Sequence, residues 1–574
     1  MSATPTRSPF WPKGLPSAIL APEVPLPHYL KTAAERFPGR PAIVFGGAEL
    51  SYAQLWQQAQ AVAGHLVARC GVQHGDRVLI MSQNCPQYVA AYYGILLAGA
   101  VVVPVNAMTT SAELSYYVQS SEAQTIVVAQ ELLPQALANF APAGAAGLQH
   151  GIVLTYSDAL AGVAAEALWP ALPPVVTAAA ETLSDDRLSA WRSVQAAALP
   201  APALERVAVD DLAVLPYTSG TTGHPKGCMH SHRTMLTSAL GAAYWRGFHA
   251  ESVFMSAAPL FHLLGMQNAM NTPIAVGCTV VMMPRWNAEL AGELIERYRV
   301  SVWTAPPAML IDFFTHASTP ARDLSSLALL SGGGAAMPEA VNTMITEQHG
   351  IAFNEAYGMT ESASFLHANP VQRGKKQCLG IPTFGVSSLV VDPATLEEVA
   401  PGEVGELVTS GAQIMLGYWR NPEANASSFF ERDGKRFFRT GDLVSVDEDG
   451  YYFMRDRLKR MINVSGYKVW PAEVESMLYE HPAVREACII ALKDAKAGEQ
   501  VKALIVLKPE LRGQTTAEDI IAWARQRMAV YKAPRQVEFV DELLKSGTGK
   551  VMWRELQEQA QQAQDRAQNA MGVD

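Results

Sequence analysis

The chain has 574 residues, 49% hydrophobic and 17% charged, which is enough apolar side chain to bury sizeable cores and excludes a disordered or fibrous chain. A net charge of -10 disfavours a general nucleic-acid binder, although a single nucleotide needs only a local basic pocket. Six scattered cysteines without a C-x-x-C pair predict reduced thiols in a cytoplasmic protein, not a disulfide framework or a zinc site.

The first predicted elements lie at the amino end. Prolines stand in the first 20 residues where a signal peptide would need an apolar run, so no such peptide is expected. The longest apolar stretch, residues 88–105, is interrupted by Gly94, Gly99 and Pro104. It predicts a buried helix running into a buried strand, and no integral membrane segment is expected.

Up to about residue 455, short β-branched runs alternate with helical patterns. The runs at 101–106, 279–284 and 301–307 are predicted strands. This alternation predicts an α/β protein whose large N-terminal domain, residues 1–455, has layered sheets and helices. Between 129 and 205 the sequence turns Ala- and Pro-rich, and we expect a variable surface segment there.

Residues 456–574 predict a second, small α+β domain. Helical patterns at 470–481 and 517–528 alternate with strand patterns at 487–492 and 501–507. The polar residues at the carboxyl end predict a frayed helix or tail.

The strongest local motif is Tyr-Thr-Ser-Gly-Thr-Thr-Gly-His-Pro-Lys-Gly, residues 217–227, directly after an apolar run. Its glycines allow tight turns that present backbone N–H groups, while hydroxyl side chains and Lys226 add donors and a cation. Such a loop suits a polyphosphate. It is not a Walker A loop, because Pro225 stands where that pattern needs glycine, and the Lys550 segment fails the pattern too.

This loop resembles the glycine-rich signature of the adenylate-forming superfamily, which comprises acyl-CoA synthetases, peptide-synthetase adenylation domains and beetle luciferases. Further motifs of that superfamily follow in its order across nearly the whole chain: Leu260-Phe261-His262, Ser331–Ala336, Tyr357–Glu361, Thr440-Gly441-Asp442, Asp456–Lys459 and Gly547–Lys550. The turn at 331–336 is most similar to bacterial medium- and long-chain fatty acid–CoA ligases. The resemblance implies a large N-terminal domain with a small, mobile C-terminal one.

The resemblance also implies a nucleotide site. Asp442 would accept hydrogen bonds from both ribose hydroxyls, Thr360 would bind the α-phosphate, and Glu361 would hold Mg²⁺ through oxygen ligands. The ATP- and AMP-binding residues it implies are Thr218, Ser219, Gly220, Thr221, Thr222, Gly223, Lys226, Gly333, Gly334, Ala335, Tyr357, Gly358, Met359, Thr360, Asp442 and Arg457.

Catalysis and domain rotation are likewise implied by the resemblance. Lys550 would bridge the carboxylate and the α-phosphate, with Thr360 and His262 as further catalytic residues, and Lys459 would be the hinge. After rotation, Ser465, Gly466 and Tyr467 would line the coenzyme A tunnel. A side chain in place of Gly466 would block the pantetheine arm.

An acyl pocket is expected from Trp245, His262, Leu263, Met266, Trp303 and Met309. No arginine or lysine stands among them, so an apolar acid is favoured over one with a second carboxylate. His262 either gates the pocket or polarises the carboxylate, or it is a wall residue with satisfied hydrogen bonds.

The resulting hypothesis is an AMP-forming acid–CoA ligase that uses ATP, Mg²⁺ and coenzyme A on a medium- or long-chain fatty acid. An aryl or other acid–CoA ligase, or an adenylation module that loads a carrier-protein thiol, is the alternative. The adenylation-module alternative is disfavoured because no carrier domain is recognisable in the sequence and because His262 stands where such modules usually carry aspartate. A luciferase-like oxygenase is disfavoured by Asn463, and a nucleotide sensor by the presence of Glu361 and Lys550. No nucleic-acid partner is expected; homodimerisation and peripheral membrane association stay open.

Overall fold

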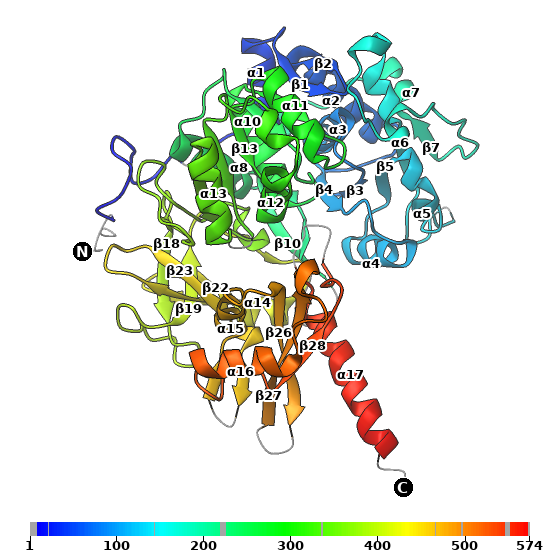
Figure 1. Ribbon diagram of the computed structural model, residues 1–574. Coiled ribbons are helices and arrows are strands. Elements are labelled where there is room, and N and C mark those ends of the chain that lie inside the picture. Colours follow the sequence, from blue (N-terminus) through cyan, green and yellow to red (C-terminus); the bar gives the residue numbers. More distant parts are fainter. Residues whose placement is uncertain are drawn as a thin grey trace. The chain divides into compact units, whose positions relative to one another are not determined.

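The structure is a computed structural model that describes residues 8–20, 22–142, 144–218, 225–334, 337–464, 467–494, 498–545 and 551–571 (Figure 1). Of residues 459, 468 and 567–571 it describes the backbone alone. The chain folds into two compact units, one of Met1–Ser387 and Ser410–Arg436 and one of Ser388–Thr409 and Phe437–Asp574. This division concerns compactness and not the point where the chain bends, so the boundary at 455/456 stays a prediction.

One sheet of the first unit is parallel at its centre, with the strand order β20-β10-β8-β4-β3-β5-β6-β7 and with β9 paired to β10. The pairs β3–β4, β3–β5, β5–β6 and β4–β8 run parallel, while β10 runs antiparallel to β8, β9 and β20. The strands are β3 (Arg77–Met81), β4 (Val101–Val105), β5 (Thr125–Ala129), β6 (His150–Leu154), β7 (Leu188–Ala190), β8 (Leu212–Val214), β9 (Tyr217–Thr218), β10 (Lys226–Ser231) and β20 (Gly417–Tyr418).

A second sheet of this unit has the order β17-β16-β15-β14-β13-β11-β12-β1-β2. Its central strands from β1 to β15 pair in parallel, and antiparallel strands close both ends. The strands are β1 (Pro41–Phe45), β2 (Ala48–Ser51), β11 (Val253–Ser256), β12 (Thr279–Met282), β13 (Val302–Thr304), β14 (Leu329–Gly332), β15 (Phe353–Tyr357), β16 (His367–Ala368) and β17 (Ile381–Pro382).

Helices cover both sheets, as expected where parallel strands are joined by crossovers. They are α1 (Leu26–Arg36), α2 (Tyr52–Ala68), α3 (Pro86–Leu97), α4 (Ser111–Ser121), α5 (Leu133–Leu137), α6 (Pro174–Thr177), α7 (Trp191–Ala197), α8 (His232–Arg246), α9 (Leu263–Met266), α10 (Thr272–Val276), α11 (Ala288–Tyr298), α12 (Pro307–Thr315), α13 (Glu339–His349) and α14 (Pro422–Ser428). A π-helical turn, η5 (Gln267–Asn271), joins α9 to α10.

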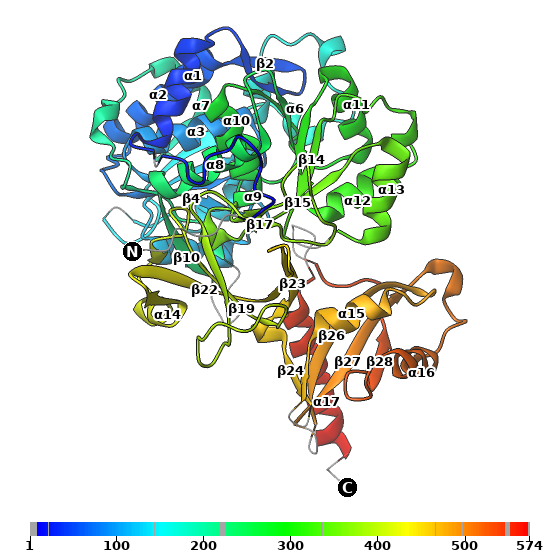
Figure 2. The same ribbon diagram turned by 90° about the vertical axis from the view of Figure 1, so that its left-hand side faces the viewer.

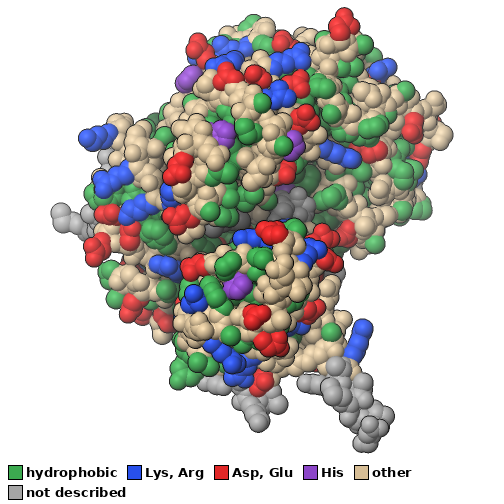
Figure 3. Space-filling model, viewed as in Figure 1, with side chains coloured by type: hydrophobic (Ala, Val, Ile, Leu, Met, Phe, Trp, Pro, Cys, Tyr) green, Lys and Arg blue, Asp and Glu red, His purple; other side chains and the backbone are tan. Residues whose placement is uncertain are grey.

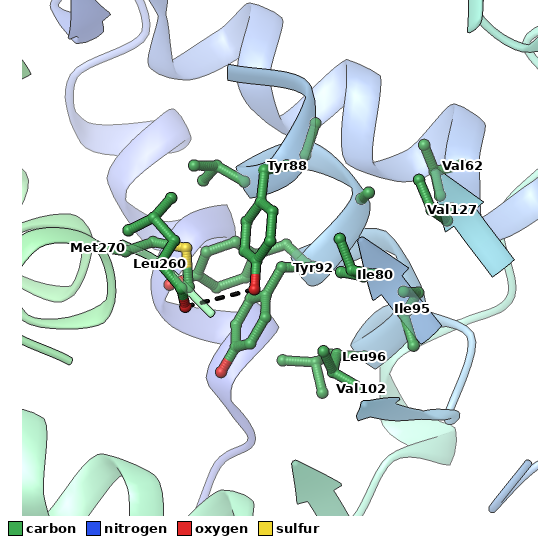
Figure 4. Packing of buried hydrophobic residues seen from close by; sticks show 14 of the residues in the cluster. Val62, Ile80, Tyr88, Tyr92, Ile95, Leu96, Val102, Val127, Leu260 and Met270 are labelled. Atoms are coloured by element: carbon green, nitrogen blue, oxygen red, sulfur yellow. Dashed lines mark hydrogen bonds between the residues drawn. The ribbon is translucent and has the colours of Figure 1, made fainter. Parts of the chain in front are cut away.

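Two hydrophobic clusters form the core of the first unit. The larger one joins both sheets through α3, whose residues are buried on every side. There Tyr88 donates to the Leu260 carbonyl at 3.3 Å, among the aliphatic side chains of neighbouring strands (Figure 4). The second cluster lies on the opposite face of the second sheet, under α11, α12 and α13 (Figure 2). Val302 and Trp303 show the division, since alternate residues of β13 point to opposite faces and fall in different clusters.

The second unit contains two further sheets. In one, β19 pairs with β18 and β22, and β23 pairs with β22; in the other the order is β25-β24-β27-β26, with β28 on β27. The strands are β18 (Ser387–Val391), β19 (Gly405–Ser410), β22 (Lys435–Val446), β23 (Tyr452–Arg457), β24 (Ile462–Val464), β25 (Tyr467–Val469), β26 (Val484–Asp494), β27 (Gly498–Leu507) and β28 (Gln536–Phe539). The helices are α15 (Pro471–Leu478), α16 (Ala517–Arg527) and α17 (Trp553–Met571). Alternate residues of β26 enter two separate apolar clusters, one on each face of the sheet.

The expected helix and strand at 88–105 are confirmed as α3 and β4, and the predicted α/β class is confirmed. The expectation for 129–205 is wrong, because β6 and β7 add to the first sheet there and Trp169 and Trp191 are buried. Ala-rich composition hid these short strands.

Nowhere in the described part of the chain does a helix have the length and apolarity to cross a membrane. The six cysteines are free, and five of them are buried. Basic and acidic side chains are interspersed over the face drawn in Figure 3.

Candidate functional site

The two ends of the glycine-rich loop are held by an antiparallel hairpin. Thr218 of β9 pairs with Lys226 of β10. Beside the hairpin, the Tyr116 hydroxyl donates to the Pro225 carbonyl at 2.6 Å. Ser219, Gly220, Thr221, Thr222 and Gly223 lie outside the described residues. The hairpin therefore fixes where the predicted phosphate loop begins and ends.

The segment after β15 turns back sharply on itself. Gly358 cannot carry a side chain, because a Cβ atom there would lie 1.5 Å from the Ser364 carbonyl oxygen. Ala363 and Ser364 adopt φ values of +50° and +85°, which are costly for residues other than glycine and persist where surrounding structure holds them. The turn that carries Met359, Thr360 and Glu361 is therefore held in a strained backbone conformation.

Glu361 is a buried carboxylate, 8% exposed, in the 3-10 turn η7 (Thr360–Ser362). Its Oε1 accepts a 2.9 Å hydrogen bond from the Tyr418 hydroxyl. Burial, followed by the charge of Glu361, raises the pKa of Tyr418 far above its ordinary value, so the phenol keeps the proton it donates. The Lys226 ammonium lies 5.0 Å from the centre of the Tyr418 ring. Strand β20 thereby links the cation of the glycine-rich loop to Glu361.

The backbone of Thr360 is held by a buried histidine. His230 Nε2 lies 2.7 Å from the Thr360 carbonyl oxygen, and Nδ1 lies 3.2 Å from the Thr234 hydroxyl. Burial lowers the pKa of His230 to about 4, so the ring is neutral at pH 7. Because a carbonyl only accepts, Nε2 carries the proton. Strand β10 therefore positions both Lys226 and, through His230, Thr360.

Gly333 and Tyr357, two of the predicted nucleotide-binding residues, lie at the ends of adjacent parallel strands. Gly333 follows β14 closely enough that a Cβ atom would lie 2.4 Å from the Ala356 carbonyl oxygen, and Tyr357, 7% exposed, ends β15. Gly334 is exposed with φ +86°, and Ala335 lies outside the described residues. Also on β15, the Glu355 carboxylate accepts from the N–H groups of Met337 at 3.4 Å and Cys378 at 2.6 Å. Burial raises the pKa of Glu355 to about 7.

Asp442 and Arg457 belong to the second unit and are cross-strand partners in β22 and β23. Arg457 Nε lies 3.1 Å from Asp442 Oδ1, and Asp442 is 1% exposed. The structure therefore brings these two predicted nucleotide ligands together as an ion pair.

The remaining C-terminal predictions are only partly described. Lys459 has its backbone in the 3-10 turn η8 (Leu458–Arg460). Tyr467 is 59% exposed and stacks on Tyr531 with ring centres 4.8 Å apart. Ser465, Gly466 and Lys550 lie outside the described residues.

The predicted acyl-pocket residues do not all come together. Leu263 and Met266 are buried in the larger cluster, whereas Trp303 is buried and Met309 half-buried in the second one. Trp303 stacks beside Trp286 and packs edge-on against Phe313 on the α12 face of its sheet, because β13 turns it there. Trp245 is packed by two other aromatic rings, Trp11 and Phe384. His262 is half-buried next to α9, and burial lowers its pKa to about 4.

Sequence reasoning missed Tyr418, His230 and Arg246. Tyr418 and His230 stand far along the chain from the turn they hold, and no local pattern identifies them. Arg246 ends α8, beside Trp245, and its Nη1 donates to the Asn268 side chain at 3.1 Å while its guanidinium lies 5.1 Å from the Phe365 ring centre. Arg246 is therefore a cation next to Trp245 that does not belong to the six residues predicted to line the pocket.

These features point to a class: a glycine-rich hairpin and a strained acidic turn in the first unit, and a carboxylate–arginine pair in the second, are typical of nucleotide-using enzymes. Comparison with known proteins gives the family. The profile of the AMP-binding enzyme family matches residues 30–419, and that of the AMP-binding enzyme C-terminal domain matches residues 473–550. The chain belongs to this family of adenylate-forming enzymes.

Named relatives span almost the whole chain. A long-chain-fatty-acid–CoA ligase of Bacillus subtilis (strain 168) is 32% identical over 96% of this chain and 97% of its own length. A feruloyl-CoA synthase of an Amycolatopsis species is 32% identical over 90% and 96%, respectively. The crystal structure of the anthranilate CoA ligase AuaEII in complex with anthranoyl-AMP has a TM-score of 0.79 at 26% identity and covers 96% of this chain and 99% of that one.

Proposed function

We propose that this chain joins a carboxylic acid with a mainly apolar carbon skeleton to coenzyme A, and that a medium- or long-chain fatty acid is its substrate. The chain is an AMP-forming acyl-CoA synthetase, an ATP-dependent ligase. In the first step a carboxylate oxygen attacks the α-phosphorus of ATP and pyrophosphate leaves. In the second, the thiol of coenzyme A attacks the acyl carbon and AMP leaves with the bridging oxygen.

The observation that carries the proposal is the connected run Lys226–Tyr418–Glu361 with Thr360 beside it. Three segments that are distant in the chain meet there: Lys226 supplies a cation, Tyr418 a hydroxyl group and Glu361 a buried carboxylate. Charge that develops on phosphoryl oxygens needs such fixed donors and cations. Asp442 would accept from the ribose hydroxyls, and Arg457 would contact the nucleotide as a permanent cation.

Mg²⁺ is part of the proposal. In the described part of the chain no three His, Cys, Asp or Glu side chains form a metal cluster, but Mg²⁺ commonly needs only one or two carboxylates besides substrate phosphates. The buried carboxylate of Glu361 fits that role. The ion would neutralise charge on the phosphates.

The small C-terminal domain is proposed to serve the two steps in turn. Lys550 would act in adenylation, whereas Ser465, Gly466 and Tyr467 would line the path of coenzyme A after rotation about Lys459. Tyr467 is exposed and stacked in the second unit, which suits a residue that meets a second substrate. A cytoplasmic location is proposed as well.

The apolar character of the acid rests on Leu263 and Met266, buried beside half-buried His262. Each methylene group of the acid that is buried against such side chains stabilises binding by about 0.8 kcal/mol. Neutral at pH 7, His262 would contact the acid through an imidazole hydrogen bond and not as a cation. Relatives named for long-chain fatty acids and for ferulate support acids of this kind.

Arg246 favours a second candidate, an acid with an additional acceptor group away from the activated carboxylate. Its Nε is buried without a hydrogen-bond partner, and no acidic side chain in the described part of the chain forms an ion pair with it. Burial lowers the pKa of Arg246 to about 10. A buried cation is costly unless an acceptor compensates it, and a substrate carboxylate or hydroxyl would do so.

The test is acid-dependent pyrophosphate release with octanoate, benzoate, succinate and octanedioate, measured with and without coenzyme A, for the natural chain and Arg246→Met. The first candidate predicts that octanoate is best and that Arg246→Met changes its kcat/KM little. If octanedioate is better and Arg246→Met reverses that order, the second candidate replaces it. If succinate is a better substrate than both octanoate and benzoate, the pocket assignment is wrong.

A further inference from the structure

Asp442 lies in an irregularity of the ladder between β19 and β22. Glu406 pairs with Leu443 and Val408 pairs with Arg439, so Leu407 alone faces the three residues 440–442. Gly441 has φ +69° within this bulge, a conformation that glycine adopts without strain. Bulges bend a strand and redirect its side chains, and they are frequent beside active sites. The direction of Asp442 therefore depends on what holds the bulge.

Glu406 lies on β19 at the edge of the bulge and is 1% exposed. Its Oε1 accepts from the Gly441 N–H at 3.2 Å, and its Oε2 accepts from Arg439 Nε at 3.0 Å and Nη2 at 2.5 Å. Arg439 Nη2 also donates to the Pro393 carbonyl at 2.9 Å. A buried carboxylate is costly unless it is paired with a cation and hydrogen-bonded. Glu406 meets both conditions, since it pairs with Arg439 and accepts from the Gly441 N–H, on the two sides of Thr440.

Thr440 completes the connection. Its hydroxyl donates to the Leu407 carbonyl at 2.7 Å and accepts from the Asp442 N–H at 3.0 Å. The backbone on each side of Asp442 is thus fixed, on one side by Glu406 and Thr440 and on the other by the β22–β23 ladder.

We propose that Glu406, held by Arg439, is a positioning residue that sets the direction of Asp442 for recognition of the ribose. This rests on the proposed function, in which Asp442 accepts hydrogen bonds from the ribose hydroxyls. Glu406 acts through the bulge and not on the nucleotide, so its loss affects hydroxyl recognition more than the reaction itself.

The experiment compares ATP with 2′-deoxy-ATP and 3′-deoxy-ATP, with kcat/KM measured by pyrophosphate release from the full chain and octanoate. The variants are Asp442→Ala, Glu406→Gln and the two combined. Glu403→Gln is the matched control, because Glu403 is an exposed carboxylate before the same strand. We expect the natural chain and the control to prefer ATP, Asp442→Ala to lose that preference, and Glu406→Gln to reduce it at least threefold. The double variant should match Asp442→Ala.

A merely structural role would lower activity with all three nucleotides equally and leave the preference unchanged, and that outcome overturns the proposal. If Glu406→Gln does not fold, Arg439→Lys keeps the charge but loses the planar fork and should reduce the preference in the same way. A preference unchanged in Asp442→Ala contradicts the ribose assignment itself. A preference lost in Asp442→Ala but kept in Glu406→Gln and Arg439→Lys contradicts only the positioning role.

Discussion

Glu361 and Asp442 are both buried carboxylates in short motifs, but their surroundings differ. Glu361 of the first unit accepts from the neutral phenol of Tyr418, whereas Asp442 of the second unit lies against the guanidinium of Arg457. The phenol of Tyr418 brings no positive charge to Glu361, which is compatible with the proposed role of this carboxylate in holding Mg²⁺. The ion pair places a permanent cation beside Asp442, the carboxylate that we propose accepts hydrogen bonds from the ribose hydroxyls. The two carboxylates thus have different partners, and we propose different roles for them, metal binding for Glu361 and ribose recognition for Asp442.

The largest expected effect is on the two chemical steps, adenylate formation and thioester formation, which Lys550 and Gly466 are proposed to serve separately. Lys550→Ala should reduce acid-dependent pyrophosphate release by roughly 10²–10³, the usual cost of losing one preorganised charge-stabilising group. Supplied with preformed acyl-adenylate, the same variant should still make thioester at nearly the natural rate. Gly466→Leu should show the reverse pattern. Proportional loss of both steps in both variants would argue against a rotating C-terminal domain.

A third carboxylate, Glu355, gives a pH test with a definite sign. Burial raises its pKa from about 4.5 to about 7, so the folded chain holds this proton more tightly than the unfolded one. Its contribution to stability is complete below pH 4.5 and is lost as the pH rises to 7, by about 3 kcal/mol at most. Urea titrations between pH 4.5 and pH 7 should show that the free energy of unfolding of the natural chain falls with rising pH relative to that of Glu355→Gln. A constant difference, like that expected for the exposed carboxylate of Glu347→Gln, would contradict the assignment.

The two carboxylates should also differ in which substrate dependence they change. Asp442→Ala should weaken ATP binding by about 1.5–3 kcal/mol, the range for hydrogen bonds to a charged group. Glu361→Gln should instead raise the Mg²⁺ concentration needed for half-maximal adenylation. Steady-state titrations of ATP at saturating Mg²⁺, and of Mg²⁺ at saturating ATP, separate the two effects. If both variants keep the natural dependence, the nucleotide site lies elsewhere.

The smallest expected effect concerns Tyr418. Tyr418→Phe removes one hydrogen bond to Glu361 but keeps the ring that contacts Lys226. We expect a loss of about 1.5 kcal/mol in adenylation, seen mainly as a raised Mg²⁺ requirement. Tyr244→Phe is the control, because it changes an exposed phenol of the first unit to which no role is assigned. An equal change in both variants would mean that Tyr418 does not act through Glu361.

The sequence predicts the fold class and the local motifs because each depends on neighbours in the chain. Gly358 and Gly333 are examples, since both must lack a side chain where the backbone approaches another carbonyl closely. Tyr418, His230 and Glu406 could not be predicted, because each acts across a strand pairing and its role exists only in the folded chain. Trp303 is predicted to line the acyl pocket but points to the other face of its sheet, because the sequence does not show which face of a strand a buried aromatic residue occupies.

The central claim is that the acid is activated as an adenylate before it reaches the thiol. The most direct measurement uses octanoate labelled with ¹⁸O in both carboxylate oxygens, together with ATP, Mg²⁺ and coenzyme A. Because the thiol attacks the acyl carbon and the bridging oxygen stays on phosphorus, we predict one ¹⁸O atom in each AMP formed, with unlabelled pyrophosphate. Label in inorganic phosphate accompanied by ADP, or AMP free of label, would contradict it.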